Sequence, residues 1–310
     1  MTSHDLVQIL PAATLAGDDS RPWQEKLARL REHLAALGSV IVAYSGGVDS
    51  SVLLRVAHEV LGAGALGVIG RSDSYAASEL ALALEQAAAF GARVETVTTG
   101  ELSDLNFRSN PANRCYHCKS ELYRKLRAVA ERTGARAVLD GTIRDDLSDW
   151  RPGRRAAAEG GVESPLADLG FTKLDVRAVA VQFGLSSHDK PASPCLASRI
   201  PYGSEITREK LQAVEASEAA LRGFGFRELR VRHLGDTARI ELPVADFVRL
   251  ADPALRGAVV RAIRRHGFLF VTLDLEGFRS GSLNAALRSG PGGAGGADLV
   301  TRPNRDEAAG

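Results

Sequence analysis

Hydrophobic residues follow two alternating patterns over the first 200 positions of the chain. Short apolar runs predict buried strands at 40–44, 65–69, 94–97 and 137–139. Stripes of apolar residues at helical spacing separate these runs and predict helices at 22–37, from about 49, at 78–90 and at 119–132. Strands that alternate with helices imply right-handed crossovers and a parallel sheet covered on both faces. Ligands bind beyond the carboxyl ends of such strands, so the loops that follow the four runs are the candidate site segments.

A different pattern begins after about residue 200. Helical stripes at 206–221 and 253–265 flank a predicted hairpin with strands at 227–232 and 237–242, and a last strand follows at 268–273. We therefore expect an α/β fold, with a parallel-sheet domain at 22–200 and a smaller C-terminal α+β domain at 201–288. A mobile N-terminus at 1–21 and a disordered, glycine-rich tail at 289–310 flank these domains.

The charge of the chain is almost balanced, with 39 Lys and Arg against 38 Asp and Glu and a formal net charge of +1. This balance is typical of an ordinary globular protein and argues against a broad nucleic-acid-binding surface. No apolar run reaches the roughly 20 residues of a membrane span, and the N-terminus lacks the pattern of an export signal. Three cysteines in such a chain indicate reduced thiols in a cytoplasmic protein rather than a disulfide framework.

The clearest motif is the loop at 45–51, which reads Ser-Gly-Gly-Val-Asp-Ser-Ser and stands between a predicted strand and a predicted helix. Its glycines let backbone N–H groups point inward, and its hydroxyls complete a cup for a polyphosphate at a helix N-terminus. The loop matches the SGGxDSS (PP-loop) pattern of enzymes that cleave ATP between the α and β phosphates and adenylate a substrate. A G-x-G-x-x-G sequence at 62–67 follows a helix and precedes a strand, the reverse of a dinucleotide site, and we interpret it as a linker.

The cysteines form a second motif. Cys115 and Cys118 are a C-x-x-C pair at a predicted helix start, and Cys195 lies in the segment Lys-Pro-Ala-Ser-Pro-Cys-Leu-Ala-Ser-Arg at 190–199. A C-x-x-C pair binds zinc or iron–sulfur clusters or acts as a redox dithiol. Three thiolates together hold a four-iron cluster and leave one iron open. The alternative is two structural cysteines and one core cysteine.

Several segments together resemble the LarE family of ATP-dependent sulfur transferases in nickel-pincer nucleotide biosynthesis. They are the loop at 45–51, Gly141-Thr142 with Asp145-Asp146 and 150–153, the segment 190–203, and Arg-Val-Arg-His at 230–233. The resemblance covers about 22–285 and implies an adenine nucleotide alpha hydrolase-like (PP-loop) domain. It also implies that the carboxylates of pyridinium-3,5-biscarboxylic acid mononucleotide are adenylated, with release of AMP and pyrophosphate, and become thiocarboxylates. Some members surrender the sulfur of the cysteine that matches Cys195 and retain dehydroalanine. Others also carry C-x-x-C and hold a [4Fe-4S] cluster, and this chain resembles those.

The motifs and the resemblance together assign the site residues. ATP is assigned to Ser45, Gly46, Gly47, Asp49, Ser50, Ser51, Gly141 and Thr142. Cys195 is the catalytic residue, and the cluster ligands are Cys115, Cys118 and Cys195. Mg²⁺ is assigned to Asp49, with Asp145 and Asp146 as further candidates. The phosphate of the substrate is assigned to Arg199, Arg230, Arg232 and Arg239, with an ordinary solvated strand face as the alternative for the arginines. Trp150 and Tyr202 are candidates to stack on the pyridinium ring, or they only pack.

The resemblance further implies a sulfide or other sulfur donor, other enzymes of nickel-pincer biosynthesis as partners, and a homo-oligomer. One alternative function is a tRNA-thiolating enzyme, which pairs the same phosphate loop with cysteines but needs a basic track for RNA. A second is an amidating ligase, which needs an ammonia source and no cysteine trio. A third is an ATP-binding module with structural zinc.

Overall fold

The computed structural model describes residues 21–147, 152–191 and 193–279. Within them, the larger sheet has four parallel strands in the order β3-β2-β1-β4. The strands are β1 (Val40–Ala43), β2 (Ala65–Arg71), β3 (Arg93–Thr98) and β4 (Ala137–Leu139). Val40 pairs with Ala65 on one side and with Ala137 on the other. The predicted parallel sheet is confirmed, and its carboxyl edge carries the loops that begin at residues 44, 72, 99 and 140.

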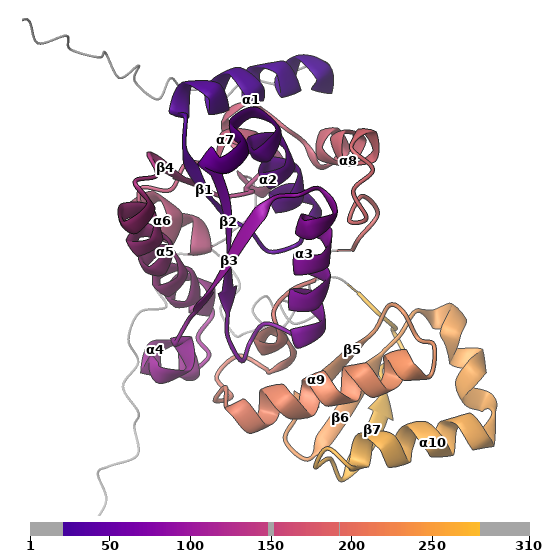
Figure 1. Cartoon of the computed structure of the whole chain (residues 1–310). Helices are drawn as coiled ribbons and strands as arrows, with labels where there is room; N and C mark the ends of the chain where they lie inside the picture. The colour runs from indigo at the N-terminus through magenta and orange to yellow at the C-terminus, as the bar shows by residue number, and fades with distance from the viewer. Residues whose placement is uncertain (1–20, 148–151, 192, 280–310) are drawn as a thin grey trace, which may run out of the picture.

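Helices cover both faces of this sheet (Figure 1). One face carries α1 (Trp23–Leu37), α2 (Val48–Leu61), α3 (Ala77–Ala89) and α8 (Lys173–Gln182). The other carries α5 (Arg114–Thr133) and α6 (Pro152–Glu159). The shorter helices are α4 (Leu105–Arg108) and α7 (Pro165–Asp168), and the 3₁₀ turns are η1 (Gly62–Gly64), η2 (Glu101–Ser103), η3 (Arg144–Leu147) and η4 (Leu196–Arg199).

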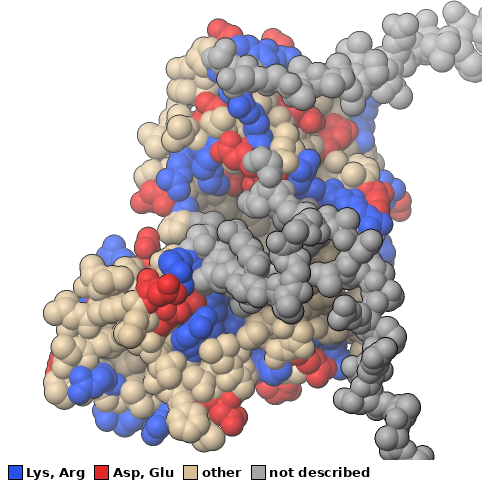
Figure 2. Space-filling model, turned by 180° about the vertical axis from the view of Figure 1, so that it is seen from behind, with Lys and Arg blue, Asp and Glu red and all other residues tan. Residues whose placement is uncertain are grey.

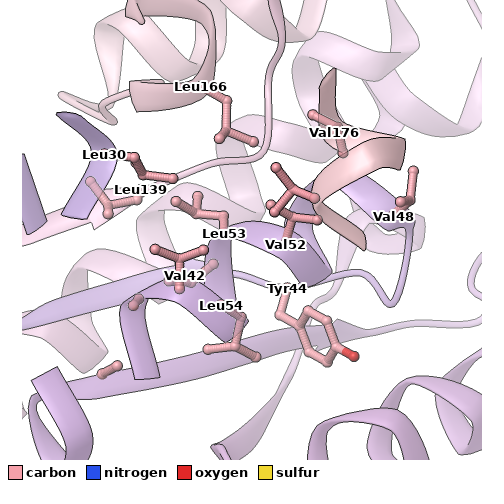
Figure 3. Close-up of a cluster of buried hydrophobic side chains, with 14 of the residues drawn as sticks. Leu30, Val42, Tyr44, Val48, Val52, Leu53, Leu54, Leu139, Leu166 and Val176 are labelled. Carbon is pink, nitrogen blue, oxygen red and sulfur yellow. The ribbon is translucent and has the colours of Figure 1, made fainter. Parts of the chain in front are cut away.

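The core between α2 and the sheet fixes the start of α2 (Figure 3). Val52, Leu53 and Leu54 of α2 are fully buried and belong to one hydrophobic cluster with Val42 of β1 and Leu30 of α1. Burial of a large aliphatic side chain contributes about 1.5–3 kcal/mol to folding. Packing of this kind holds β1 and α2 rigidly, so the loop that joins them has a defined position at the carboxyl edge.

The second sheet lies in a smaller C-terminal unit beside the first, in orange and yellow in Figure 1. Its strands β5 (Arg230–Leu234) and β6 (Thr237–Glu241) form the predicted antiparallel hairpin, and β7 (Phe270–Leu273) runs parallel to β6. The helices α9 (Arg208–Gly223) and α10 (Pro253–Arg264) and the turn η5 (Val244–Ala251) complete the unit. The predicted small α+β unit is therefore confirmed.

Some element boundaries differ from the prediction. The helix predicted at 119–132 begins at Arg114, so both cysteines of the C-x-x-C pair lie inside the helix, at its N-terminal end. The helices α6, α7 and α8 were not predicted, although Thr172 and Asp175 form a capping box at the start of α8. The division at residue 200 stays a prediction, and the predicted tail and all but Arg21 of the predicted N-terminus lie outside the described residues. Among the described helices, none has the length and apolar character needed to cross a membrane.

Candidate active site

The loop between β1 and α2 joins hydroxyl and backbone groups at the carboxyl edge of the sheet. Ser45 donates its N–H to Oγ of Ser50 at 3.1 Å, and the hydroxyl of Ser51 donates to the carbonyl of Gly47 at 2.8 Å. Gly47 is also the N-terminal cap of α2, so the first N–H groups of that helix face the loop. Such a loop is suited to the phosphates of a nucleotide.

Two glycines allow close approaches around this phosphate loop. Gly46 has a φ of +65°, and a Cβ there would lie 2.6 Å from Cβ of Ala83 on α3. A Cβ on Gly141 would lie 2.8 Å from the backbone nitrogen of Ser50. The structure thus brings the predicted segments 45–51 and 141–142 together, although they lie far apart in the sequence.

Thr142 is held by Asp140, a residue that the sequence analysis did not identify. The backbone N–H and the hydroxyl of Thr142 both donate to the Asp140 carboxylate, at 3.1 and 2.9 Å. Tyr123 and Ser164 donate to the same carboxylate at 2.9 and 2.7 Å. Asp140 is 4% exposed and is therefore a buried anchor for the turn that faces the phosphate loop.

Lys173, the first residue of α8, is the cation that the sequence analysis missed. Its Nζ donates to both carboxylate oxygens of Asp49 at 2.8 Å, and its backbone N–H donates to Asp145 at 2.8 Å. Burial raises the pKa of the Asp49 carboxyl; Lys173 opposes this rise, and the Asp146 carboxylate adds to it. The predicted Mg²⁺ candidates Asp49 and Asp145 therefore both contact this lysine, with Asp146 close to Asp49. The Thr172–Asp175 capping box was the sequence signal that could have located it.

The three cysteines lie near one another. Cys115 and Cys118 are three residues apart at the N-terminal end of α5 and so occupy neighbouring positions on its surface, and Cys195 directly precedes η4. Cys118 and Cys195 pack against the same hydrophobic cluster. Burial raises the pKa of the Cys118 thiol well above its usual value, and Glu101, Cys195 and Cys115 raise it further. A thiol of this kind keeps its proton until a cation replaces it.

No group of three or more His, Cys, Asp or Glu in the described part of the chain is arranged to hold a metal ion. A four-iron cluster makes a different demand, because its cysteines bind separate irons and stand farther apart. Two half-buried thiols, Cys118 and Cys195, and the exposed thiol of Cys115 lie on two neighbouring elements and are a donor set that fits such a cluster.

The turn after β2 connects the phosphate loop with the cysteine segment. The hydroxyl of Tyr75 donates to the carbonyl of Ser45 at 2.9 Å. Leu196, next to Cys195, donates its N–H to the carbonyl of Ser74 at 2.8 Å. One short turn after β2 therefore contacts both motifs. The phosphate loop and the Cys195 segment thus both lie at the carboxyl edge of the sheet.

Arg199 holds the cysteine segment in place. It is 4% exposed, and its guanidinium pairs with Glu218 of α9, with Nε 2.9 Å from Oε1. It also donates to the carbonyls of Pro194 and Cys195. These contacts hold the guanidinium of Arg199 against the backbone of the Cys195 segment, and its predicted contact with the substrate phosphate stays a prediction.

The other three arginines also differ from one another. Arg232 is 2% exposed and makes two hydrogen bonds of 2.9 Å to Glu241, and it donates to the carbonyl of Ser198 at 2.6 Å. Arg239, more exposed, lies 3.5 Å from Glu241 and from Asp274.

Arg230 is 5% exposed and lies over the ring of Phe278, with 4.7 Å from the guanidinium carbon to the ring centre. No carboxylate among the described residues forms an ion pair with it. Burial lowers the pKa of Arg230, and the neighbouring Arg232 and Arg199 lower it further. The alternative of a solvated strand face is wrong for Arg230 and Arg232, because both are buried.

The two aromatic candidates are in different positions. The ring of Tyr202 already faces the guanidinium of Arg114, whose central carbon lies 4.6 Å from the ring centre. Trp150 lies outside the described residues. Tyr202 therefore packs against a cation, and its predicted stacking on the pyridinium ring stays a prediction.

Basic and acidic side chains are interspersed on the face that Figure 2 shows, outside the area covered by grey atoms. On that part of the surface, the described residues form no continuous basic track of the kind that an RNA substrate needs.

The chain is similar to known proteins over most of its length, although no family model matches it. An uncharacterized protein of Synechocystis sp. is 46% identical over 264 residues, which are 85% of this chain and 98% of that protein. The pyridinium-3,5-bisthiocarboxylic acid mononucleotide synthase of Lactiplantibacillus plantarum is 40% identical over 266 residues, 84% of this chain and 95% of that enzyme. An uncharacterized protein of Methanocaldococcus jannaschii is 28% identical over 259 residues, 83% of this chain and 98% of that protein.

Proposed function

Because the chain belongs to the LarE family of pyridinium-3,5-bisthiocarboxylic acid mononucleotide synthases, we propose that it activates the carboxylates of a pyridinium mononucleotide with ATP and replaces an oxygen of each with sulfur. The enzyme thus acts as a sulfurtransferase in nickel-pincer cofactor synthesis. The observation that carries this proposal is the turn at Ser74 and Tyr75, which contacts both the phosphate loop and the segment of Cys195. An acyl-adenylate formed at the loop then lies close to the sulfur donor.

In the first step, a substrate carboxylate attacks the α-phosphorus of ATP, and pyrophosphate leaves. A free carboxylate is a poor acyl donor because its leaving group would be oxide, whereas AMP is a stable leaving group. The N–H groups of the phosphate loop and the ammonium of Lys173 stabilise the charge that develops on pyrophosphate. Lys173 is suited to this role because its side chain is 39% exposed and flexible, so it can turn from Asp49 to the nucleotide.

Mg²⁺ fits beside the same loop, because carboxylate oxygens are the ligands that this cation prefers. Asp49, with Asp145 and Asp146 as further candidates, would hold it once Lys173 has turned to the phosphates. When bound, Mg²⁺ supplies additional positive charge to the leaving pyrophosphate.

In the second step, a hydrosulfide sulfur attacks the acyl carbon, the bond to AMP breaks, and a thiocarboxylate forms. Cys115, Cys118 and Cys195 would hold a [4Fe-4S] cluster, which supplies an open iron at which inorganic sulfide is kept for transfer. Arg199 supports this step indirectly, since its bonds to the carbonyls of Pro194 and Cys195 fix the backbone that carries the third thiol.

The phosphate of the substrate binds at the arginines of the C-terminal unit. Arg230 is the strongest candidate, since it is a buried cation without an ion pair among the described residues. Arg239 is a second candidate, because its side chain is 36% exposed. Arg199 and Arg232 contribute positive charge nearby while their own carboxylate partners hold them in place.

We place this reaction in the cytoplasm, with a sulfide or other sulfur donor and the other enzymes of nickel-pincer biosynthesis as partners, in a homo-oligomer. The test is an anaerobic assay of the reconstituted protein with ATP, the biscarboxylic acid mononucleotide and sulfide. We expect AMP and pyrophosphate to form only when the mononucleotide is present, together with the thiocarboxylate. ADP and phosphate as the main products would contradict the proposal.

A further inference from the structure

Glu101 is a buried carboxylate that neither step uses. It is the first residue of η2, directly after β3 and Thr99-Gly100, and it is 2% exposed. Its Oε1 accepts a hydrogen bond from the hydroxyl of Ser74 at 2.8 Å. Among the described residues, no group donates to Oε2. A buried carboxylate oxygen without a donor is costly to the folded protein, so its position calls for a positively charged partner.

Glu101 lies in the same part of the structure as the three cysteines. Leu102, the next residue, packs against the hydrophobic cluster that includes Cys118 and Cys195. Ser74, which holds Oε1, also accepts the N–H of Leu196 beside Cys195. The free oxygen therefore lies in the same region as the thiols.

The negative charges in this region also favour a positively charged partner for Glu101. If the three thiols ionise, they and Glu101 place up to four negative charges close together, with Glu101 buried and Cys118 and Cys195 half-buried. Lys119 is a nearby cation, and its effect on the pKa of the Cys118 thiol is weaker than the effects of burial, Glu101 and the other two cysteines. Arg114 is a buried guanidinium at the start of α5; one of its terminal nitrogens donates to Asn110, its face lies against the ring of Tyr202, and no described group accepts from its Nε. A cationic iron–sulfur core offsets such a concentration of negative charge better than a single distant ammonium does.

We propose that Oε2 of Glu101 is the ligand of the iron that the three cysteines leave open. This inference rests on the cluster in the proposed function. Glu101 would then keep the iron in the cluster between turnovers and give way to sulfide. In that exchange the iron–oxygen bond breaks and an iron–sulfur bond to hydrosulfide forms, with no change in oxidation state and with the carboxylate released as the anion that it already was.

The test compares anaerobically reconstituted wild-type protein with Glu101→Gln, which preserves the shape and the bond from Ser74 but replaces the ligating oxygen with an amide. The matched control is Glu95→Gln, the same change on β3 at a surface ion pair with Arg132. Under mild oxidation, followed by iron analysis and by electron paramagnetic resonance, Glu101→Gln should pass to the three-iron form roughly 10-fold faster or more than wild type or the control.

A second measurement separates ligation from a structural role. Hydrosulfide titration of the intact cluster should give a lower apparent dissociation constant for Glu101→Gln than for wild type, because the competing carboxylate is gone. A loosened site alone would not make hydrosulfide bind more tightly. Equal iron retention and equal hydrosulfide affinity in the two proteins would overturn the inference and leave the proposed cluster intact.

A third measurement needs no variant and covers the case in which Glu101→Gln does not fold. Wild-type protein labelled with carboxyl-¹³C glutamate should show a ¹³C hyperfine coupling to the reduced cluster, and its absence would contradict ligation by Glu101. Wild-type protein that binds no iron after reconstitution would overturn the cluster of the proposed function, and the inference with it.

Discussion

Lys173 and Asp49 form an ion pair across 124 positions of the chain, with Nζ 2.8 Å from both carboxylate oxygens. The pair joins the start of α8 to the start of α2, directly beside the phosphate loop. It holds a cation beside the loop. A nucleotide that enters the loop brings negative charge that competes with Asp49 for the lysine.

Replacement of this lysine tests its role in adenylation. Lys173→Met should lower the rate of substrate-dependent exchange between ATP and pyrophosphate by about 100-fold or more, because a preorganised donor to the developing charge is lost. Arg177→Met, one helical turn along α8 at an exposed position, is the control and should leave the exchange unchanged. Normal exchange in Lys173→Met would remove the lysine from the mechanism.

Substitution of Gly141 tests the close approach between the turn after β4 and the start of α2. Gly141→Ala should impair ATP binding, because the new Cβ would lie 2.8 Å from the backbone nitrogen of Ser50 and must displace the helix start. Such overpacking costs typically about 1–3 kcal/mol. Gly223→Ala, in α9 with no atom near the new Cβ, is the matched control. Calorimetric titration with a non-hydrolysable ATP analogue measures both, and equal affinities would contradict the expectation.

Arg230 and Arg232 should respond differently to substitution. Arg230→Gln should weaken binding of the mononucleotide about 10-fold with little effect on ATP, because a charge-assisted contact to phosphate is worth roughly 1.5–3 kcal/mol. Arg232→Met should instead lower the free energy of unfolding by about 3 kcal/mol, since it leaves the fully buried Glu241 without its closest partner. Substrate affinity and urea unfolding, measured on both variants, check this contrast. Equal changes of substrate affinity and of the free energy of unfolding in both variants would show that the two arginines have the same role.

The ion pair between Lys26 and Asp175 should make stability depend on pH. Lys26 is 2% exposed, and its Nζ lies 2.8 Å from the Asp175 carboxylate. Burial raises the pKa of Asp175, but the hydrogen bonds from Lys26 and Thr172 outweigh this and leave the pKa below its usual value. Because the folded pKa is the lower one, the stabilisation is present above the unfolded pKa of about 3.9 and is lost as the pH falls through the folded value.

Asp175→Asn should therefore lower the free energy of unfolding at neutral pH by about 2–3 kcal/mol, since it leaves a buried ammonium unpaired. Urea unfolding between about pH 6 and pH 3 should then show a shallower loss of stability in the variant than in wild type. Parallel pH profiles for the two proteins would show that this carboxylate does not control acid stability.

Substitution of Cys115 distinguishes repeated sulfur transfer from a cluster from a single transfer of the Cys195 sulfur. Cys115→Ala should lose the brown colour of the reconstituted protein and, with it, more than one product per chain, because two thiolates hold a four-iron cluster poorly. It should keep at most a single turnover through the sulfur of Cys195. Product counts with excess sulfide and intact-protein mass spectrometry make the measurement. One product or less per chain in wild type, with dehydroalanine at position 195, would show that the sacrificial route operates.

The sequence alone determined the parallel sheet, the hairpin, the phosphate loop and the cysteine motif. These features depend on neighbouring residues. A buried strand needs a short apolar run, and the loop at 45–51 needs glycines and hydroxyls within seven positions. Helix starts were less exact, as the early start of α5 at Arg114 shows, because the first turn of a helix makes few bonds of its own.

Only the tertiary structure decided which polar side chains are committed to partners and which are available. Arg199, Arg230 and Arg232 look equivalent in the sequence, yet Glu218 and Glu241 engage the first and the last as ion pairs. Glu101 stands in the sequence as an ordinary acidic residue after a strand, and nothing local marks it as buried. Burial and pairing arise from contacts between segments far apart in the chain, and the free energy of a charge depends on those contacts rather than on its neighbours in sequence.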